Sequence, residues 1–275
     1  MVIGVWRYLL IDIQGLSAPF LFLKLVKNNM STSNFMTFSG NHLFHYTSFD
    51  SALKIISSNT LKFGLFENMN DIAEVKREYF TNIDVEEVEL EMKKYKSISF
   101  TWDDSNKRGY EIDSLWGYYA QKGNGVCLVF DKSMLLNCLE EKSKTYDKRI
   151  EYLNNFSNAI PLNGNNNEEV SRYIAEHVDD LFFTKSLDWK HEHEYRFLLY
   201  SLNEEKTLFL KNSLLAIILC MPKQDEIEDT LEYKILSKLI DLPILHYKTC
   251  LGEKGLYWKE QKLYPVLGRD YNIDI

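Results

Sequence analysis

Apolar residues along the chain alternate with polar ones in some stretches and recur three or four residues apart in others. The first pattern predicts strands and the second helices. Residues 43–46 fit a short strand, and 49–59 fit a helix that Thr47 or Ser48 can cap. Further strands are predicted at 97–102, 126–130, 195–200, 207–210, 214–221 and 243–248, and further helices at 72–79, 86–95, 114–120 and 226–241.

The predicted elements follow one another in mixed order, with hairpin-like links and longer crossovers. This order is typical of an α+β fold with a mixed, mainly antiparallel sheet and flanking helices. We expect one such domain over residues 36–275, with a mostly helical insertion at about 132–187, where the pattern is polar. Residues 195–200 and 207–210 predict strands on either side of a polar turn. Residues 214–221 are apolar throughout and predict a buried central strand.

The first 35 residues differ in character from the rest. They are largely apolar, but Arg7, Asp12 and Gln14 interrupt them, so no stretch reaches the roughly 18 to 20 residues of a spanning helix. Met30 opens a polar stretch that resembles an ordinary protein start. We expect residues 1–35 to be an extension upstream of the working start, with no membrane span; a peripheral helix or a membrane-proximal segment is the alternative.

Composition narrows the class of protein. Hydrophobic residues make up 45% of the chain, enough for a packed core, and the net charge is −8. That charge argues against non-specific nucleic-acid binding, which depends on neutralising phosphates, but it leaves room for a local basic pocket. Four cysteines without a C-x-x-C pair favour a reduced cytoplasmic protein over a zinc or disulfide framework: Cys127, Cys138, Cys220 and Cys250.

The richest chemistry lies around the start of the strand predicted at 195–200. If the strand extends backwards, Glu192, Glu194 and Arg196 share one face, and His191 and His193 share the other. Burying charge is costly unless the charge is paired or used. The cluster is therefore either a structural ion-pair node or a site. Two histidines without a third ligand at recognisable spacing do not predict a metal site.

Two earlier stretches offer pocket residues. The imidazole of His45, beside the hydroxyls of Tyr46 and Thr47, can hold a ribose hydroxyl or a phosphate; a satisfied histidine with a capping threonine is the structural alternative. Alternation places Ser97, Ser99 and Thr101 in one polar row, backed by an aromatic row and followed by Trp116 and Tyr119. Such a wall suits a ring-bearing ligand, although core packing explains the same aromatics.

Taken in order, these motifs resemble a bacterial and phage family known as domain of unknown function 2971. The resemblance covers about residues 43–248. Family members usually carry a glycine near Cys220, which this chain lacks, and membership implies no established activity. The motifs are His45-Tyr46-Thr47, Asn70-Asp71, Ser99-Phe100, residues 115–120, 125–131 and 185–189, and Glu192, Glu194 and Arg196.

The same pattern is similar, more distantly, to the ADP-ribosyltransferase superfamily. There a first motif holds the nicotinamide ribose, a second supports it, and a glutamate opening a late strand stabilises the ribosyl cation. The resemblance implies these roles for His45, Ser99 and Glu194, with Glu192 as a paired carboxylate. It also implies an ADP-ribosyltransferase-like sheet and Tyr118 or Tyr119 stacking on nicotinamide.

We therefore expect an ADP-ribosyltransferase-like enzyme that uses NAD as substrate and acts as a bacterial or phage defence or toxin effector. Its catalytic residues would be Glu194 and Glu192, and its partners a small nucleotide ligand and a protein or nucleic-acid acceptor. A non-catalytic nucleotide-binding sensor and, behind it, a hydrolase or nuclease are the alternatives. The residues expected to contact NAD are His45, Tyr46, Thr47, Ser99, Trp116, Tyr119 and Arg196, the last through the pyrophosphate.

Overall fold

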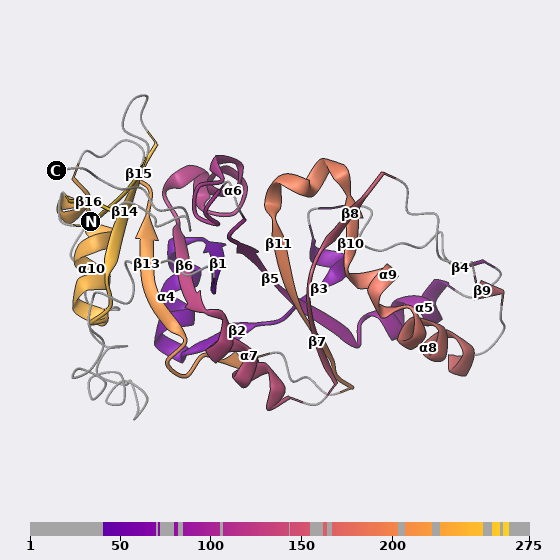
Figure 1. Ribbon diagram of the computed structural model, residues 1–275. Helices are drawn as coiled ribbons and strands as arrows, with labels where there is room; N and C mark the ends of the chain where they lie inside the picture. The colour runs from indigo at the N-terminus through magenta and orange to yellow at the C-terminus, as the bar shows by residue number, and fades with distance from the viewer. Residues whose placement is uncertain are drawn as a thin grey trace, which may run out of the picture.

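Figure 1 shows the computed structural model of the chain. It describes residues 41–69, 71, 80–81, 85–104, 107–142, 144–154, 162–163, 167–202, 207–221, 226–249, 255–258 and 261–263. The extension expected at 1–35 and the helix expected at 72–79 lie outside the described residues.

One sheet of ten strands runs across the molecule, in the order β16-β15-β14-β13-β6-β1-β5-β11-β7, with β3 paired to β5 off this path (Figure 1). All its pairs are antiparallel except β13 with β14. This confirms the α+β prediction with a mainly antiparallel sheet. Its strands are β1 (His42–Thr47), β3 (Gly64–Leu65), β5 (Tyr95–Trp102), β6 (Val126–Asp131), β7 (Thr145–Arg149), β11 (Glu194–Tyr200), β13 (Leu214–Leu219), β14 (Ile244–Lys248), β15 (Gly255–Trp258) and β16 (Gln261–Leu263).

Three small sheets of two strands each accompany it. They pair β2 (Thr60–Lys62) with β12 (Thr207–Phe209), β8 (Glu151–Leu153) with β10 (Thr184–Ser186), and β4 (Phe80–Thr81) with β9 (Leu162–Asn163). The strand predicted at 207–210 thus pairs with β2, and does not form a hairpin with β11. The reason is long-range packing, since Leu208 is buried opposite Leu61 in the same core cluster.

Helices flank the sheet. Ser48, and not Thr47, caps α4, because its Oγ accepts a hydrogen bond from Ser51 N at 3.1 Å. The insertion expected at 132–187 contains α7, α8 and α9 and also the strands β7 to β10. Among the described residues, no helix is both long and apolar enough to cross a bilayer. The helices are α4 (Phe49–Ser58), α5 (Val85–Met92), α6 (Asp113–Tyr118), α7 (Lys132–Glu140), α8 (Asn167–Glu176), α9 (Val178–Phe182) and α10 (Leu231–Leu239), with 3₁₀ turns η1 (Phe66–Asn68), η3 (Gln121–Gly123), η4 (Leu187–Glu192) and η5 (Ile227–Asp229).

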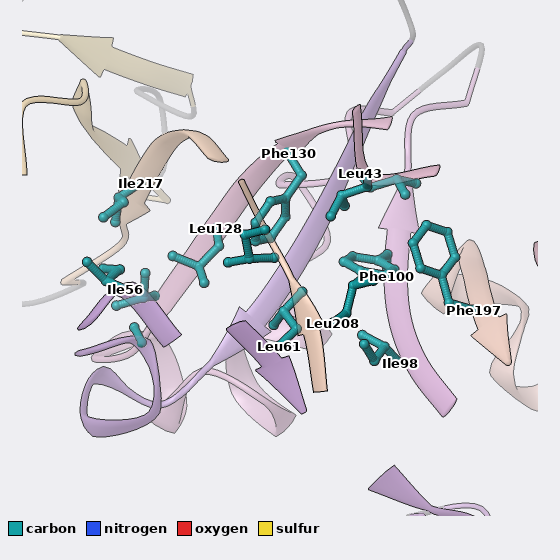
Figure 2. Packing of buried hydrophobic residues seen from close by; sticks show 14 of the residues in the cluster. Leu43, Ile56, Leu61, Ile98, Phe100, Leu128, Phe130, Phe197, Leu208 and Ile217 are labelled. Atoms are coloured by element: carbon teal, nitrogen blue, oxygen red, sulfur yellow. The ribbon is translucent and has the colours of Figure 1, made fainter. Parts of the chain in front are cut away.

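The core lies on both faces of the sheet. One cluster joins residues of β1, β5, β6, β11 and β13 to α4, α7 and α10, and Figure 2 shows Leu128, Phe100 and Phe197 within it. A second cluster, on the opposite side of β1, β6 and β13, includes α6. A third gathers α5, α8 and α9 at the far end of the sheet (Figure 1). Leu43 and Phe44, adjacent on β1, enter different clusters, as strand alternation requires.

Strand β1 is paired unequally on its two sides. Against β6 it forms six residue pairs, along its whole length. Against β5 it forms only the pairs Leu43 with Trp102 and Phe44 with Thr101. After Phe44 the two strands cease to pair and diverge (Figure 1). We call this place, between residues 44–46 of β1 and 97–101 of β5, the fork.

Candidate functional site

A cavity of about 510 Å³ lies at the fork. Its walls come from β1 and β5, from residues 62–69, from α6 and the residue after it, and from β10, η4 and β11. Small-molecule sites in proteins have volumes of about 300 to 1,000 Å³, so the cavity has the size of a ligand site. Segments separated by well over a hundred residues thus converge where two adjacent strands stop pairing.

His45 bridges the fork where the backbone ladder stops. Its Nδ1 lies 3.0 Å from Ser99 O, and because a carbonyl only accepts, Nδ1 carries the proton. Burial lowers the pKa of His45, and the bond to Ser99 offsets this only in part. The ring is therefore neutral at physiological pH, and its Nε2 is a hydrogen-bond acceptor. Phe100 supports the ring edge-on, with 5.7 Å between centroids.

Glu194 is the centre of a buried polar cluster on β11. Ser99 Oγ donates to its Oε1 at 2.7 Å. Arg196 grips both oxygens, with Nε 2.7 Å from Oε1 and Nη2 3.1 Å from Oε2. The strand register explains the meeting, since Arg196 lies directly opposite Ser99. Only 3% of Glu194 is exposed, so its carboxylate is held in one orientation by fixed donors.

The charge state of Glu194 follows from these partners. Burial by itself raises the pKa of a carboxyl group, but the positive charges of Arg196 and Lys185, and their hydrogen bonds, lower the pKa of Glu194 to about 2. Glu194 is thus an anion at any physiological pH. The Arg196 guanidinium is completely buried and also donates from Nη1 to Phe182 O at 2.6 Å.

Lys185, on β10, joins the two glutamates. Its Nζ lies 2.8 Å from Glu194 Oε2 and 2.9 Å from Glu192 Oε2. Tyr119 OH donates to the other oxygen of Glu192 at 2.7 Å. Sequence reasoning did not select Lys185 as a site residue, although it opens the family motif at 185–189. A lysine two residues after the apolar run Leu181–Phe183 was the available signal.

The predicted face-sharing of the cluster needs correction. Strand β11 begins at Glu194, whereas Glu192 ends η4, and His193 between them has a left-handed backbone with φ of 47°. Glu192 and Glu194 therefore meet through Lys185 and not through strand alternation. His193 Nδ1 lies 3.0 Å from Asp104, and His191 Nδ1 contacts Asp188 O. Among the described residues, no group of three or more potential ligands could hold a metal ion.

Four of the residues expected to contact the ligand line the cavity: His45, Tyr46, Ser99 and Tyr119. Tyr46 does so with its hydroxyl already donated to Gly109 O at 2.6 Å.

Trp116, Thr47 and Arg196, also expected to contact the ligand, are not among the described residues that line the cavity. The indole of Trp116 is buried in the second core cluster and donates to Tyr110 O at 2.8 Å. Arg196 is fully buried behind Glu194. The cavity also includes Tyr118, which is 66% exposed and is one of the two tyrosines expected to stack on nicotinamide, and Lys62, which was not among the predicted contacts.

Comparison with known proteins finds a match to a family model over part of the chain. No curated protein matches this chain. DarT from Thermus sp. 2.9 in complex with ADP-ribosylated ssDNA is 14% identical, with a TM-score of 0.34 over 74% of this chain and 90% of that chain. The same protein in complex with carba-NAD+ gives 14% identity and a TM-score of 0.35 over 75% and 95%. Similarity at this level establishes neither a shared fold nor an activity. Residues 115–197, from α6 to the Glu192 and Glu194 cluster, match the family described as "Protein of unknown function (DUF2971)", which confirms the predicted family resemblance over that stretch.

Proposed function

We propose that the chain is an ADP-ribosyltransferase-like enzyme that uses NAD as its substrate and binds it in the cavity at the fork. One observation carries this proposal. His45, Ser99 and Glu194, which the resemblance assigns to three separate motifs, form a continuous hydrogen-bonded chain on the cavity wall. They come from β1, β5 and β11, which are adjacent strands of the sheet.

The chemistry of the cluster suits cleavage of a nicotinamide–ribose bond. Breaking that bond develops positive charge on the sugar, and a fixed anion in a water-poor site stabilises such charge most effectively. Glu194 is an anion whose orientation Ser99 and Arg196 fix. Glu192, held by Tyr119 and Lys185, supplies the second carboxylate. No proton transfer to either glutamate is needed for this role.

The remaining cavity residues fit the other parts of NAD. The free acceptor of His45, Nε2, suits a ribose hydroxyl as donor. Tyr119 is held by its bond to Glu192, whereas Tyr118 presents an exposed ring on the cavity wall. Of the two tyrosines that the resemblance offers, Tyr118 is therefore the better stacking partner for nicotinamide.

One observation favours a second function. The two carboxylates are matched by two buried cations, Lys185 and Arg196, so the cluster has no net charge. Neutralisation weakens the field that a developing sugar cation would meet. The same geometry without catalysis would be a sensor module that binds a nucleotide and does not cleave it.

Incubation of the purified protein with NAD+, with nicotinamide release as the readout, separates the two. We expect release by the wild type and a loss of about 100-fold or more in Glu194→Gln, the range for removing a group that stabilises transition-state charge. Glu91→Gln is the matched control, because Glu91 is also buried and ion-paired, with Lys94, but is not among the described residues that line the cavity. Thermal melts show whether each variant is folded.

The outcomes are distinct. Binding of NAD+ without nicotinamide release by the wild type would favour the sensor and exclude the enzyme. Release that Glu194→Gln leaves intact would remove Glu194 from the mechanism. Labelled NAD+ offered with protein or single-stranded nucleic acid identifies the acceptor class. Growth of cells expressing wild type or Glu194→Gln tests the toxin or defence role, since only the active protein should slow it.

A further inference from the structure

The cavity is lined by both acidic and basic side chains. Of the cations predicted or found near it, Arg196 is bound to Glu194 and Phe182 O, and Lys185 to both glutamates. Lys62 also lines the cavity; its backbone belongs to the β2–β12 ladder, and its side chain makes no ion pair or hydrogen bond with any described residue. Arg196 was expected to bind the pyrophosphate, but its guanidinium is occupied by Glu194 and Phe182 O. Among the described residues that line the cavity, Lys62 is the cation whose side chain is available for the pyrophosphate.

We propose that Lys62 and Ser97, which both line the cavity, form a binding site for the phosphate groups of a ribose-linked diphosphate. This inference rests on the proposed function in that the diphosphate of NAD is the ligand expected there. It replaces Arg196 with Lys62 as the phosphate-binding cation.

Ser97 is the second, independent observation. Only 3% of the residue is exposed, and its Oγ has no hydrogen-bond partner among the described residues. Burying a hydroxyl without a partner costs free energy, so buried polar groups are nearly always satisfied. Ser97 lines the cavity and shares a strand face with Ser99, whose Oγ reaches Glu194. A ligand oxygen in the cavity is the acceptor that its hydroxyl lacks.

The backbone brings the segment that carries Lys62 beside β5. Gly64 pairs directly with Ser97 in the antiparallel β3–β5 ladder, and the residues before Gly64, Lys62 among them, run in the direction of Ser99. Gly64 leaves room beside the strand, because even an added Cβ would meet only Ser97 O, at 3.7 Å. A lysine ammonium is a compact point charge that binds phosphate oxygens without demanding a bidentate geometry.

Calorimetric titration of the full chain with NAD+, ADP-ribose, ADP and nicotinamide riboside tests the site. In Lys62→Gln we expect affinity for the three diphosphates to fall by about tenfold or more, the range for losing one charge-assisted hydrogen bond. Affinity for the riboside, which has no phosphate, should not change. Ser97→Ala should weaken the diphosphates by a smaller factor. Lys54→Gln is the control, since Lys54 is exposed on α4 and is not among the described lining residues.

Each outcome decides at least one of the two proposals. Equal diphosphate affinity of Lys62→Gln and Lys54→Gln would overturn the inference and leave the proposed function standing. Binding of ADP but not of NAD+ or ADP-ribose would overturn the proposed function, while a loss of ADP affinity in Lys62→Gln would still support the phosphate site. A wild type that binds none of the three diphosphates would overturn both the inference and the proposed function.

Discussion

The two sides of strand β1 show how the same strand serves stability and ligand chemistry. Towards β6 it is paired along its whole length, and the side chains of β6 are buried in apolar clusters on both faces. Towards β5 it is paired at two positions only, and a cavity opens beyond them. Where backbone groups pair with one another, apolar side chains fill the space around them. Where pairing stops, backbone and side-chain polar groups become available to a ligand.

The side of β1 towards β5, which we call the forked side, is held in place by side-chain contacts; the side towards β6 is the paired side. At the fork, the imidazole of His45 bonds to Ser99 O in place of a backbone N–H. Glu194 and Glu192 are not left alone, because Arg196 and Lys185 match their charges. Buried charges without such partners would be strongly destabilising. The paired side of β1 should therefore tolerate pH change but not cavities, and the forked side should show the opposite sensitivity.

The largest effect on stability should come from truncating a buried side chain on the paired side. Leu128 on β6 is fully buried in the first core cluster. Truncation in Leu128→Ala should lower the free energy of unfolding by about 3 to 4 kcal/mol, through lost transfer energy and the cavity left behind. Urea unfolding measures this. Phe209→Ala is the control, because Phe209 is 57% exposed and should change stability by less than about 1 kcal/mol.

The same variant tests whether the two sides are separate. Leu128 is not among the described residues that line the cavity. Ligand affinity of the folded Leu128→Ala protein should therefore match that of the wild type. A large loss of affinity would mean that the fork depends on the packing of β6, and the division between the two sides would fail.

The paired side was also the part that the sequence predicted best. The strands expected at 126–130 and 214–221 are present as Val126–Asp131 and Leu214–Leu219, because continuous apolar runs report burial directly. The helix expected at 49–59 is present as Phe49–Ser58. Its apolar spacing made it predictable, because that spacing marks the face that packs against the core. The pairing of β12 with β2 was not predictable, because it depends on contacts between distant segments.

On the forked side, sequence reasoning found His45, Ser99 and Glu194 through the order of their motifs. It did not find the turn at His193, because a left-handed residue that is not glycine leaves no sequence signal. Lys185 and Lys62 were missed because a lysine becomes a site residue only through what it faces in the fold. The sequence could not place Trp116, which lies in the second core cluster, because an aromatic residue in a helix fits a pocket wall and a core equally well.

The second largest effect should come from acid, which lowers the free energy of unfolding when Glu194, on the forked side, loses its charge. The pKa of Glu194 is about 2 in the folded protein, against an ordinary value of 4.5. A lowered folded-state pKa contributes stability that is fully present above pH 4.5 and is lost as the pH falls towards 2. The expected loss is on the order of 3 kcal/mol.

Other carboxylates also titrate in this range, so the measurement is a difference. Free energies of unfolding are compared for wild type and Glu194→Gln from pH 6 to pH 2.5. The stability advantage of the wild type should shrink steadily below pH 4.5. An advantage that stays constant over this range would show that Arg196 and Lys185 do not hold Glu194 as an anion.

The smallest and sharpest test compares two serines on one strand. Ser97 and Ser99 are two residues apart on β5 and both line the cavity. Ser99 Oγ donates to Glu194, whereas Ser97 Oγ has no partner among the described residues. Ser99→Ala should lower the free energy of unfolding by about 1 kcal/mol, since Arg196 and Lys185 still satisfy the carboxylate.

Ser97→Ala should instead leave the free energy of unfolding unchanged or raise it slightly, because it removes a buried hydroxyl that has no protein partner. Urea unfolding of both variants without ligand gives the comparison. If Ser97→Ala is destabilised as much as Ser99→Ala, Ser97 has a structural role and is not held ready for a ligand. If it is as stable as the wild type but binds diphosphates more weakly, its buried hydroxyl contributes to binding and not to folding.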